Sequence, residues 1–339
     1  MAGTAFLVPN GTAGVIAETV RGTTPASGTV FYIPVVDPAV NPVATFLDDG
    51  AMRGSPVDLY DMVQGVRHDE FDHKSFLYAD TFPVYVKALL GGTDTVTTST
   101  TSYSHAIPLL NAAATGSQPP SYSWCNFDGA NYFILPGAQA ASMNLTFGAE
   151  AAAEATMKWI CNSYVDSTSA PTPFTSTSFS AEHLIPAWNT TVSIAASTFT
   201  NVVNGELTID RKTAPIFTMG SETSYANFAG GISVTGKFTL VVATNADAFS
   251  ISSSTGSALV RATKALVITL TDPNDINTSI HDSVSFTMSQ VQFHTPKRHV
   301  GKNWLEIDVE FAAEGDSTDA TTGYSPIKAT IVNGIVAAF

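Results

Sequence analysis

Charged side chains are scarce in this chain of 339 residues, because Asp, Glu, Lys and Arg make up only 13% of it, about half the share of an ordinary soluble protein. A soluble monomer normally covers its surface with more Lys and Glu. The low charge therefore indicates that other subunits cover much of the surface. Hydrophobic residues make up 44% of the chain, enough for one large core or two modest ones.

Basic residues in particular are few, 15 against 29 acidic ones, which leaves a formal net charge of −14. A protein that grips nucleic acid needs a basic patch to neutralise phosphates. The densest basic cluster here is only Lys297, Arg298 and Lys302. An acidic surface instead repels DNA and lets it slide past. The composition thus argues against a DNA-gripping protein, but not against one along which DNA moves.

Cysteine is nearly missing, with Cys125 and Cys161 as the only two. A disulfide-stapled secreted domain carries more, so we expect two reduced, partly buried thiols, with a single bridge between them as the alternative. The first ten residues lack the basic segment and the apolar run of a secretory signal. No apolar run reaches transmembrane length. These absences predict a protein that is made and assembled in the cytoplasm, without a membrane partner.

Signatures of enzymes are also missing from the sequence. There is no nucleophile elbow, Walker A loop, H-E-x-x-H motif or dinucleotide-binding glycine pattern, and no C-x-x-C pair for zinc or redox chemistry. We predict that the chain is not an enzyme and holds no cofactor. A hydrolase with a scattered active site stays open, because catalytic residues need not be adjacent in sequence.

One dense cluster of titratable residues lies at 67–74, with the sequence RHDEFDHK. On a strand, His68, Glu70 and Asp72 share a face and could ligate a metal ion. Asp69 and Glu70 point to opposite faces and therefore cannot flank one bond as acid and base. We favour the simpler interpretation, a strand whose alternating charges pair with a neighbour.

Strand patterns are abundant: short runs of Val, Ile, Phe, Thr and Tyr lie between Gly, Pro, Asn and Asp. We expect strands at 29–36, 142–147, 206–210, 231–244, 265–271, 284–293, 304–311 and 327–332. The run 304–311 alternates with a period of two, which is typical of a strand with one buried and one wet face. Its apolar face carries Leu305, Ile307, Val309 and Phe311. Its polar face carries Trp304 and the three carboxylates Glu306, Asp308 and Glu310.

Helix signals are few. The best is 80–90, where Asp80 can cap, Pro83 lies in the first turn, and Gly91 with Gly92 ends the segment. Residues 149–160 have a helix-forming composition, but the resemblance described below implies a strand, which we favour.

Low-complexity stretches suggest how the chain is divided. The Thr/Ser-rich stretch 93–104 predicts a loop, and the Ser/Thr/Pro-rich stretch 163–180 predicts a linker between halves of similar size. The halves look like weak copies: 66–78 matches 231–244, and the strand pair from 131 onward matches 284–311. We expect an arm with the first strands at 1–50, a β unit at 51–165, a linker at 166–185 and a second β unit at 186–339.

Several segments resemble the tail tube (major tail) proteins of long-tailed phages. The run DTFPVYVKALLGG at 80–92 resembles the strand-to-helix element of that family, which ends in "LLGG". YSHAI at 103–107 and SMNLTF at 142–147 resemble two of its strands. Further similar segments are 121–124, 205–212, 236–241, 304–312 and 327–334. The order and spacing of these segments across 66–334, rather than any single motif, carry the resemblance.

The resemblance implies a β-sandwich or half-barrel flanked by one or two short helices. Such subunits form rings whose inner strands join into one barrel, and the rings stack into a tube in the virion. Members with a duplicated unit form trimers with pseudo-sixfold symmetry, which we favour here, and single-unit members form hexamers. The implied partners are further copies of the chain, the tape measure protein, the tail terminator, the distal tail or baseplate proteins, and, transiently, double-stranded DNA.

In a ring, an acidic strand could line the pore and keep phosphates from sticking. Ordinary solvent exposure is the alternative for a single chain. The candidate pore-lining residues are Glu306, Asp308, Glu310, Asp69, Glu70, Asp72, Glu206 and Asp210.

Other classes of protein remain possible on the sequence. A secreted carbohydrate-binding or adhesin module would explain the aromatic and Asn/Thr-rich loops. A phage decoration or sheath protein would share the acidic, Ser/Thr-rich β composition. A tube protein should polymerise into hollow rods, whereas a decoration protein should bind preformed shells and a lectin should bind glycans.

Overall fold

The computed structural model of the chain describes residues 11–36, 40–51, 53–99, 102–112, 116–175, 178–179, 183–242, 263–277, 280–294, 297–300, 304–336 and 339. Its elements in chain order are β1 (Thr12–Ala17), β2 (Phe31–Ile33), β3 (Val40–Asp49), β4 (Asp61–Phe76), α1 (Phe82–Leu90), β5 (Thr95–Ser99), β6 (Ser102–Ile107), β7 (Tyr122–Phe127), β8 (Tyr132–Gly148), β9 (Glu154–Cys161), β10 (Val165–Ser167), a 3-10 turn (Ala187–Asn189), β11 (Thr190–Ile194), β12 (Ser197–Phe199), β13 (Val202–Asp210), β14 (Ala214–Ile216), β15 (Ala226–Phe228), β16 (Ser233–Val241), β17 (Lys264–Asn277), β18 (Ile280–Phe293), β19 (Lys297–Val300), β20 (Leu305–Ala313) and β21 (Lys328–Asn333).

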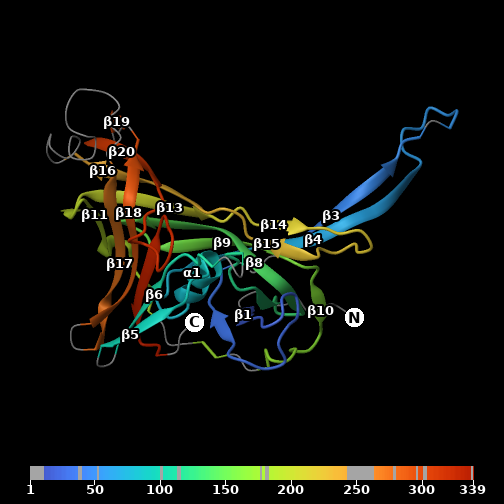
Figure 1. The fold of residues 1–339 in the computed structure, drawn as a ribbon, viewed down its shortest axis with the longest axis horizontal. Helices are drawn as coiled ribbons and strands as arrows, with labels where there is room; N and C mark the ends of the chain where they lie inside the picture. The colour runs from blue at the N-terminus through green and yellow to red at the C-terminus, as the bar shows by residue number, and fades with distance from the viewer. Residues whose placement is uncertain are drawn as a thin grey trace, which may run out of the picture.

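The fold is mainly β, as the sequence predicts, with 58% strand and 4% helix, and the strands of the described residues do not close into a barrel. One layer runs β3-β4-β9-β8-β13-β16-β20 through antiparallel pairings. A second layer, β11-β17-β18-β21-β6-β5, stands against it and is joined to it where β18 pairs with β20. The amino-terminal strands form a third group, β2-β1-β7, on the first part of β8. Figure 1 shows these layers with α1 beneath the long strands β8 and β9.

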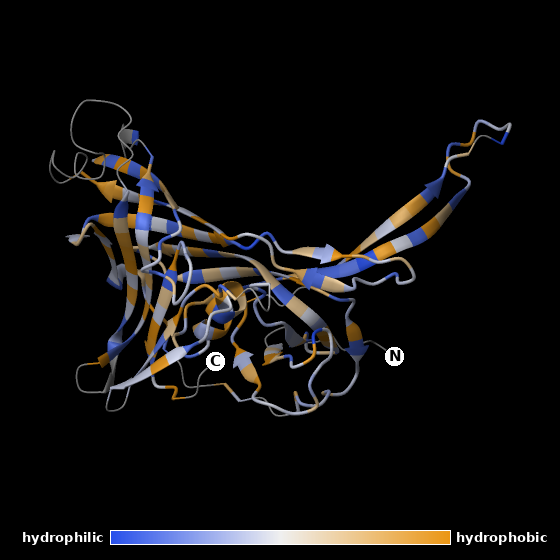
Figure 2. Ribbon diagram, in the orientation of Figure 1, coloured by the Kyte–Doolittle hydropathy of each residue, from blue (hydrophilic) through white to orange (hydrophobic). Residues whose placement is uncertain are grey.

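A single large core lies among these layers and draws residues from both halves of the chain. Its largest fully buried side chains include Trp124, Trp159 and Phe71 from the first half and Phe286 and Phe311 from the second. The faces of the strands that point into this core are apolar, and the alternation is visible along the strands in Figure 2. The strand 304–311 behaves as its period of two predicts: Ile307, Val309 and Phe311 are buried.

The predicted helix is confirmed as α1, with a proline in its first turn and Gly91 closing it at φ 73°. The residues at 154–161, for which composition and family resemblance disagree, form the strand β9. The predicted loop at 93–104 is wrong, because its threonines form β5 and its end opens β6. Threonine is β-branched and favours strands, so low complexity there reflects a strand rather than a loop.

The stretch predicted to be a linker is partly integrated into the fold. It includes β10, which pairs with β8, and Phe174, which is buried against Ile16 and Cys125. Cys125 and Cys161 are both free and buried, in agreement with the expected reduced thiols. The predicted division into two β units stays a prediction, although one core and one continuous sheet join both halves.

The strand pairings of the first half recur in the second half, in the same chain order. The seven matching antiparallel pairs are β1–β2 and β11–β12, β1–β7 and β11–β17, β3–β4 and β13–β16, β4–β9 and β16–β20, β7–β8 and β17–β18, β8–β9 and β18–β20, and β8–β10 and β18–β21. The segments that look alike in sequence, 66–78 with 231–244 and 131 onward with 284–311, hold corresponding strands of this pattern.

A first prediction concerns the end of α1. A Cβ at Gly92 would collide with the backbone carbonyl oxygen of Pro108. Because this atom belongs to the backbone, it cannot move aside as the end of a flexible side chain could. We expect Gly92→Ala to lower the free energy of unfolding by about 2 kcal/mol, the usual cost of overpacking, as measured by urea denaturation. Gly231→Ala is the matched control, since a Cβ there meets nothing within 4 Å. Equal stabilities of the two variants would contradict this packing.

Candidate assembly surfaces

Seven of the eight candidate carboxylates lie on one face of a single sheet. The strand register places them in β4, β13 and β20, whose side chains at these positions point away from the core. We call this surface the polar face; its charged residues are Glu70, Asp72, Lys74, Glu154, Lys158, Glu206, Asp210, Lys237, Lys297, Glu306, Asp308 and Glu310. Eight carboxylates against four lysines leave it with a net charge of −4.

Ion pairs join charged side chains of neighbouring strands on this face. The Lys158 ammonium lies 2.7 Å from the Glu70 carboxylate, and that of Lys237 lies 3.0 Å from Glu206. Hydrogen bonds from Lys237 and Asn144 keep the pKa of Glu206 below its ordinary value. Because these pairs are exposed, each contributes only about 0.5 kcal/mol. They leave several carboxylates in excess, and the face remains acidic.

Asp69, the eighth candidate, does not belong to the polar face. It lies on the opposite side of β4, is 3% exposed, and accepts a hydrogen bond from the backbone N–H of Tyr164. Burial raises the pKa of Asp69, although the Tyr164 N–H, Arg67 and His68 oppose that shift. The strand period of two separates Asp69 from Glu70 and Asp72, so we leave it out of any pore-lining role.

The second surface is a β-hairpin arm that projects from the body, formed by β3 and the first part of β4 (Figure 1). On the side of Asp69 toward the tip, the described part of β4 pairs with β3 and makes one isolated bridge, from Arg67 to Thr223. The arm carries large apolar side chains that are 44–63% exposed, namely Phe46, Leu47, Val57, Leu59, Met62 and Val63. An isolated two-stranded ribbon is marginally stable in water, so these features indicate a surface that another chain covers.

A bulge near the middle of the arm distorts the ribbon. The register of β3 against β4 shifts between Ala44 and Phe46, where Gly65 and Val66 of β4 lie opposite the single residue Thr45. The Thr45 hydroxyl donates to the carbonyl of Val66 at 2.9 Å, and a Cβ at Gly65 would strike that hydroxyl. Bulges of this kind bend a ribbon and increase its twist, and this one therefore contributes to the direction in which the arm leaves the body.

The hairpin β14–β15 braces the base of the arm. The N–H of Arg67 donates to the carbonyl of Glu222 at 2.7 Å, and the rings of His68 and Phe217 lie 6.0 Å apart, edge to face. By the repeated topology, β14–β15 lies between β13 and β16 as the tip of the arm lies between β3 and β4. It also exposes apolar side chains, of which Met219 and Tyr225 are the most accessible.

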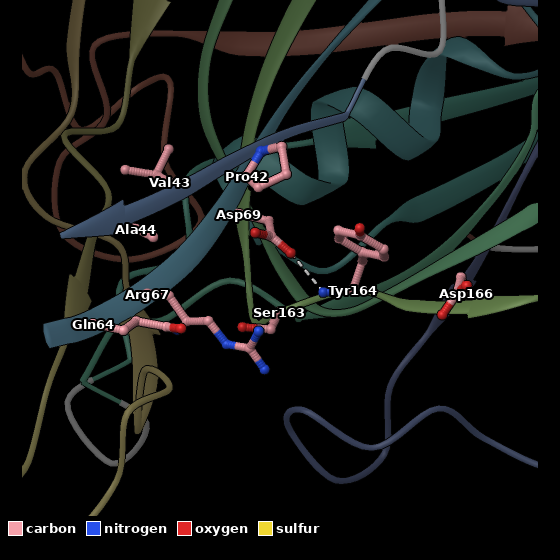
Figure 3. Close-up of a pocket in the computed structure, with 9 residues that line it drawn as sticks. All are labelled: Pro42, Val43, Ala44, Gln64, Arg67, Asp69, Ser163, Tyr164 and Asp166. Carbon is pink, nitrogen blue, oxygen red and sulfur yellow. Dashed lines mark hydrogen bonds between the residues drawn. The ribbon is translucent and has the colours of Figure 1, made fainter. Parts of the chain in front are cut away.

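A cleft of about 380 Å³ opens beside the base of the arm (Figure 3). Its walls come from β3, β4 and the segment after β9, and include Gln64, Arg67, Asp69, Ser163, Tyr164 and Asp166. The Arg67 Nε and the Ser163 hydroxyl are buried without a hydrogen-bond partner. The lining is polar and holds no arrangement of nucleophile and base, so the cleft does not resemble a catalytic site.

The sequence did not single out the arm. The signal was present as two apolar runs, 43–47 and 59–63, separated by a Gly/Ser/Pro-rich turn, which is a hairpin pattern. Neither run alternates cleanly, because both faces of a free ribbon are exposed and no core selects one of them.

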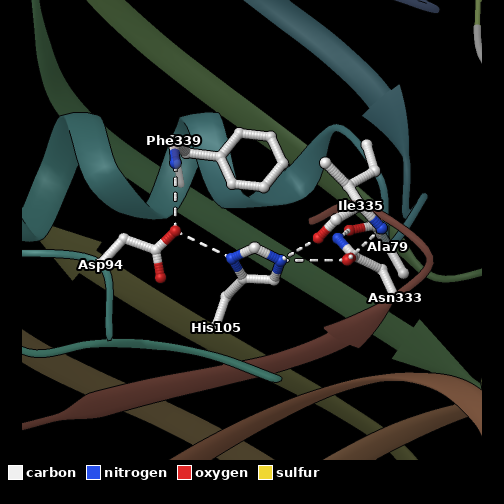
Figure 4. Close-up of polar contacts among 6 residues, drawn as sticks. All are labelled: Ala79, Asp94, His105, Asn333, Ile335 and Phe339. Atoms are coloured by element: carbon white, nitrogen blue, oxygen red, sulfur yellow. Dashed lines mark hydrogen bonds and ion pairs between the residues drawn. The ribbon is translucent and has the colours of Figure 1, made fainter. Parts of the chain in front are cut away.

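His105, from the segment that resembles a family strand, is fully buried in a polar cluster that holds the carboxy-terminal residues (Figure 4). Its Nδ1 donates to Asp94 at 2.8 Å, and its Nε2 donates to the carbonyl of Ile335 at 2.9 Å. Both ring nitrogens face acceptors, an arrangement that favours the doubly protonated imidazolium over the neutral ring. The N–H of Phe339 donates to the same Asp94 carboxylate at 3.1 Å. The cluster thus ties the last strand to α1 and β6.

The described part of the chain holds no group of three or more His, Cys, Asp or Glu side chains placed to bind a metal ion. In the cluster at 67–74, Glu70 instead contacts Lys158 and His68. Within the same described residues, no helix is long and apolar enough to span a membrane.

Comparison with known families identifies the class of protein to which the chain belongs. The family described as "Phage tail tube protein" matches residues 9–322, nearly the whole chain. The chain therefore belongs to the phage tail tube protein family and is a structural component of a phage tail in the virion. No curated protein matches the sequence.

A second prediction follows from the buried imidazolium. Burial disfavours the cation, but the hydrogen bond and charge of Asp94, with the acceptors Ile335 and Asn333, raise the pKa of His105. A raised pKa in the folded state means stability that is present below the ordinary histidine pKa and lost as pH rises through the folded value. Asp94→Asn should therefore cost about 3 kcal/mol at pH 6 and flatten the loss of melting temperature between pH 6 and 9.

His294→Gln is the control for this experiment, since His294 is exposed, and it should keep the wild-type pH dependence. An Asp94→Asn protein whose melting temperature still falls with pH as in the wild type would show that His105 is neutral.

Proposed function

We propose that this chain is the main tail tube subunit: copies close into rings with the polar face inward, and rings stack through the arm. Membership of the tail tube family and the gathering of seven candidate carboxylates on one sheet face support this proposal. The single observation that carries it is the polar face, because a soluble monomer has no need to collect its few charges on one side of one sheet.

An acidic inner wall suits the passage of DNA. Like charges on the wall and on the phosphates prevent counterion release, which is the main source of non-specific DNA binding. Repulsion keeps the duplex centred and lets it slide. The lysines of the polar face are paired with carboxylates, as Lys237 is with Glu206 and Lys297 with Glu310. They offer few free cations to which a phosphate could bind.

The repeated strand pairings favour a ring of three chains with pseudo-sixfold symmetry over a ring of six chains. Each chain then supplies two similar β units, so that three chains present six units around the pore. The tube would enclose the tape measure protein, meet the tail terminator at one end and the distal tail or baseplate proteins at the other, and carry double-stranded DNA transiently at ejection. Assembly would take place in the host cytoplasm.

The arm is suited to contacts between rings. Its exposed apolar residues lie outside the core, so they contribute nothing to the stability of the free subunit. Burying them against a neighbouring ring would release about 25 cal/mol for each Å² of apolar surface removed from water. Repetition along the axis would give the open, head-to-tail contact that builds a filament.

A third prediction tests assembly. The purified wild-type chain at rising concentration should form rings and hollow tubes under negative-stain electron microscopy, with class averages that show the symmetry. Phe46→Ser with Leu47→Ser should leave the melting temperature unchanged and abolish tubes, because both side chains are exposed and lie outside the core.

Val20→Ser is the control, since Val20 is equally exposed, at 63%, but lies away from the arm. If the doubly substituted arm variant forms tubes as well as the wild type does, the arm does not stack the rings. If the wild type stays monomeric at every concentration and binds glycans in an array screen, the adhesin interpretation replaces the tube.

A fourth prediction tests the inner wall. Glu306→Lys with Asp308→Lys should leave tubes intact and slow the release of DNA from virions, because the added cations attract phosphates. Release is followed by the fluorescence of a DNA-binding dye. The control, Glu150→Lys with Asp166→Lys, makes the same charge change outside the polar face and should eject at the wild-type rate. Equal rates for both variants would place β20 away from the DNA.

A further inference from the structure

The repeated topology relates two strand ladders of equal length. In the first half, Asp69–Phe76 of β4 pairs with Glu154–Cys161 of β9; in the second, Val234–Val241 of β16 pairs with Glu306–Ala313 of β20. Both ladders contain eight pairs. Superposing them end to end assigns each residue of one half a counterpart in the other, and makes Thr156 the counterpart of Asp308.

The same correspondence extends to the flanking strands. β18 and then β19 pair along β20 as the single strand β8 pairs along β9. Asn144 of β8 pairs with Thr156, and Lys297 of β19 pairs with Asp308, so Lys297 is the counterpart of Asn144. On the other side of the ladders, Asn41 of β3 pairs with Glu70, and Thr208 of β13 pairs with Thr235, the counterpart of Glu70. Asn41 is therefore the counterpart of Thr208.

One pairing joins the two halves of the chain. β8 pairs with β13 over seven residues, and in it Asn144 lies opposite Thr208 and donates to its hydroxyl at 3.3 Å. The counterparts of the paired segments, β19 for the end of β8 and β3 for β13, lack this pairing. Among the described residues, β19 pairs only with β20 and β3 pairs only with β4, so each has an open edge.

We propose that the open edge of β19 pairs with the open edge of β3 of a second copy, repeating between chains the β8–β13 pairing within the chain. This inference rests on the proposed ring and names the strands that close it. Lys297 of one copy then lies opposite Asn41 of the next, as Asn144 lies opposite Thr208. The sheet that carries the polar face continues from copy to copy without an interruption.

The two edges fit each other chemically. Asn41 and Lys297 are both exposed, and the sequence after Lys297 is the densest basic run of the chain. In the next copy, Asn41 lies beside Glu70, with Asp72 two residues further on. The cation on β19 therefore meets the acidic part of the neighbouring polar face. Pro42 follows Asn41 and has no N–H to donate, which limits the ladder on that side.

An edge-to-edge contact also protects the open edges of β19 and β3 from aggregation. Open strand edges pair with other chains and cause aggregation unless they are covered. The chain carries little charge to protect them. A closed ring in which β19 meets β3 gives both of these edges a defined partner. Figure 1 places β3 and β19 at opposite ends of the molecule, where they cannot pair within one copy.

The test is a disulfide at the predicted junction in the full-length chain. Asn41→Cys with Lys297→Cys, oxidised under conditions in which the wild type forms tubes, should give covalent dimers and larger species on non-reducing gels, ending at the number of chains in the ring. The native Cys125 and Cys161 are buried and free, so they do not compete. Each single substitution should yield none of the larger covalent species.

The matched control is Thr97→Cys with Lys297→Cys. Thr97 lies exposed on β5, which also has an open edge among the described residues but is not a counterpart of β13. This pair should stay monomeric on the gel. Tubes that form without a cross-link between positions 41 and 297, or equal cross-linking in the control pair, would overturn the β19–β3 junction and leave the tube intact. The absence of rings and tubes from the wild type, with no cross-link, would overturn both.

Discussion

The pairing of β8 with β13 is the interaction on which the rest of the structure depends. It joins strands of the two halves into one continuous sheet and buries Leu145 and Leu207 together in the common core. Without it, the polar face would be two small surfaces at an undefined angle. Because antiparallel pairing fixes register to the residue, it also places Glu206 of the second half opposite Thr146, which lies opposite Glu154 of the first half.

The two faces of that sheet have different roles. One face supplies the apolar side chains of the core, whose burial stabilises the subunit. The other carries four of the six Lys or Arg ion pairs found among the described residues, and an excess of carboxylates. Each exposed pair contributes little stability, so the charge pattern is better explained by what passes over the face than by folding. The arm differs again, since it lies outside the core and gains from burial only in an assembly.

Some of this could be predicted from sequence because the residues involved report on local geometry. The alternation at 304–311 defines a strand with one buried face whatever surrounds it. Proline in a first turn and Gly91 after the last one mark the limits of α1. The prediction of a loop at 95–99 is wrong because Thr/Ser-rich composition is typical of linkers. The β-branched threonines of this segment nevertheless have a high strand propensity, and they form β5. The arm is not predicted from the sequence, because neither of its faces packs on a core and its residues therefore show no regular alternation of apolar and polar side chains.

The sequence by itself determined the β class, the helix, the low charge and the family, because these depend on local patterns and on the order of segments along the chain. Only the tertiary structure decided which carboxylates share a face. Asp69 and Glu70 are neighbours in sequence yet lie on opposite sides of β4, whereas Glu70 and Glu310 are far apart in the chain and lie on one sheet face. The register between distant strands determines which carboxylates share a face. That register depends on pairing and burial over the whole sheet rather than on any local run of residues.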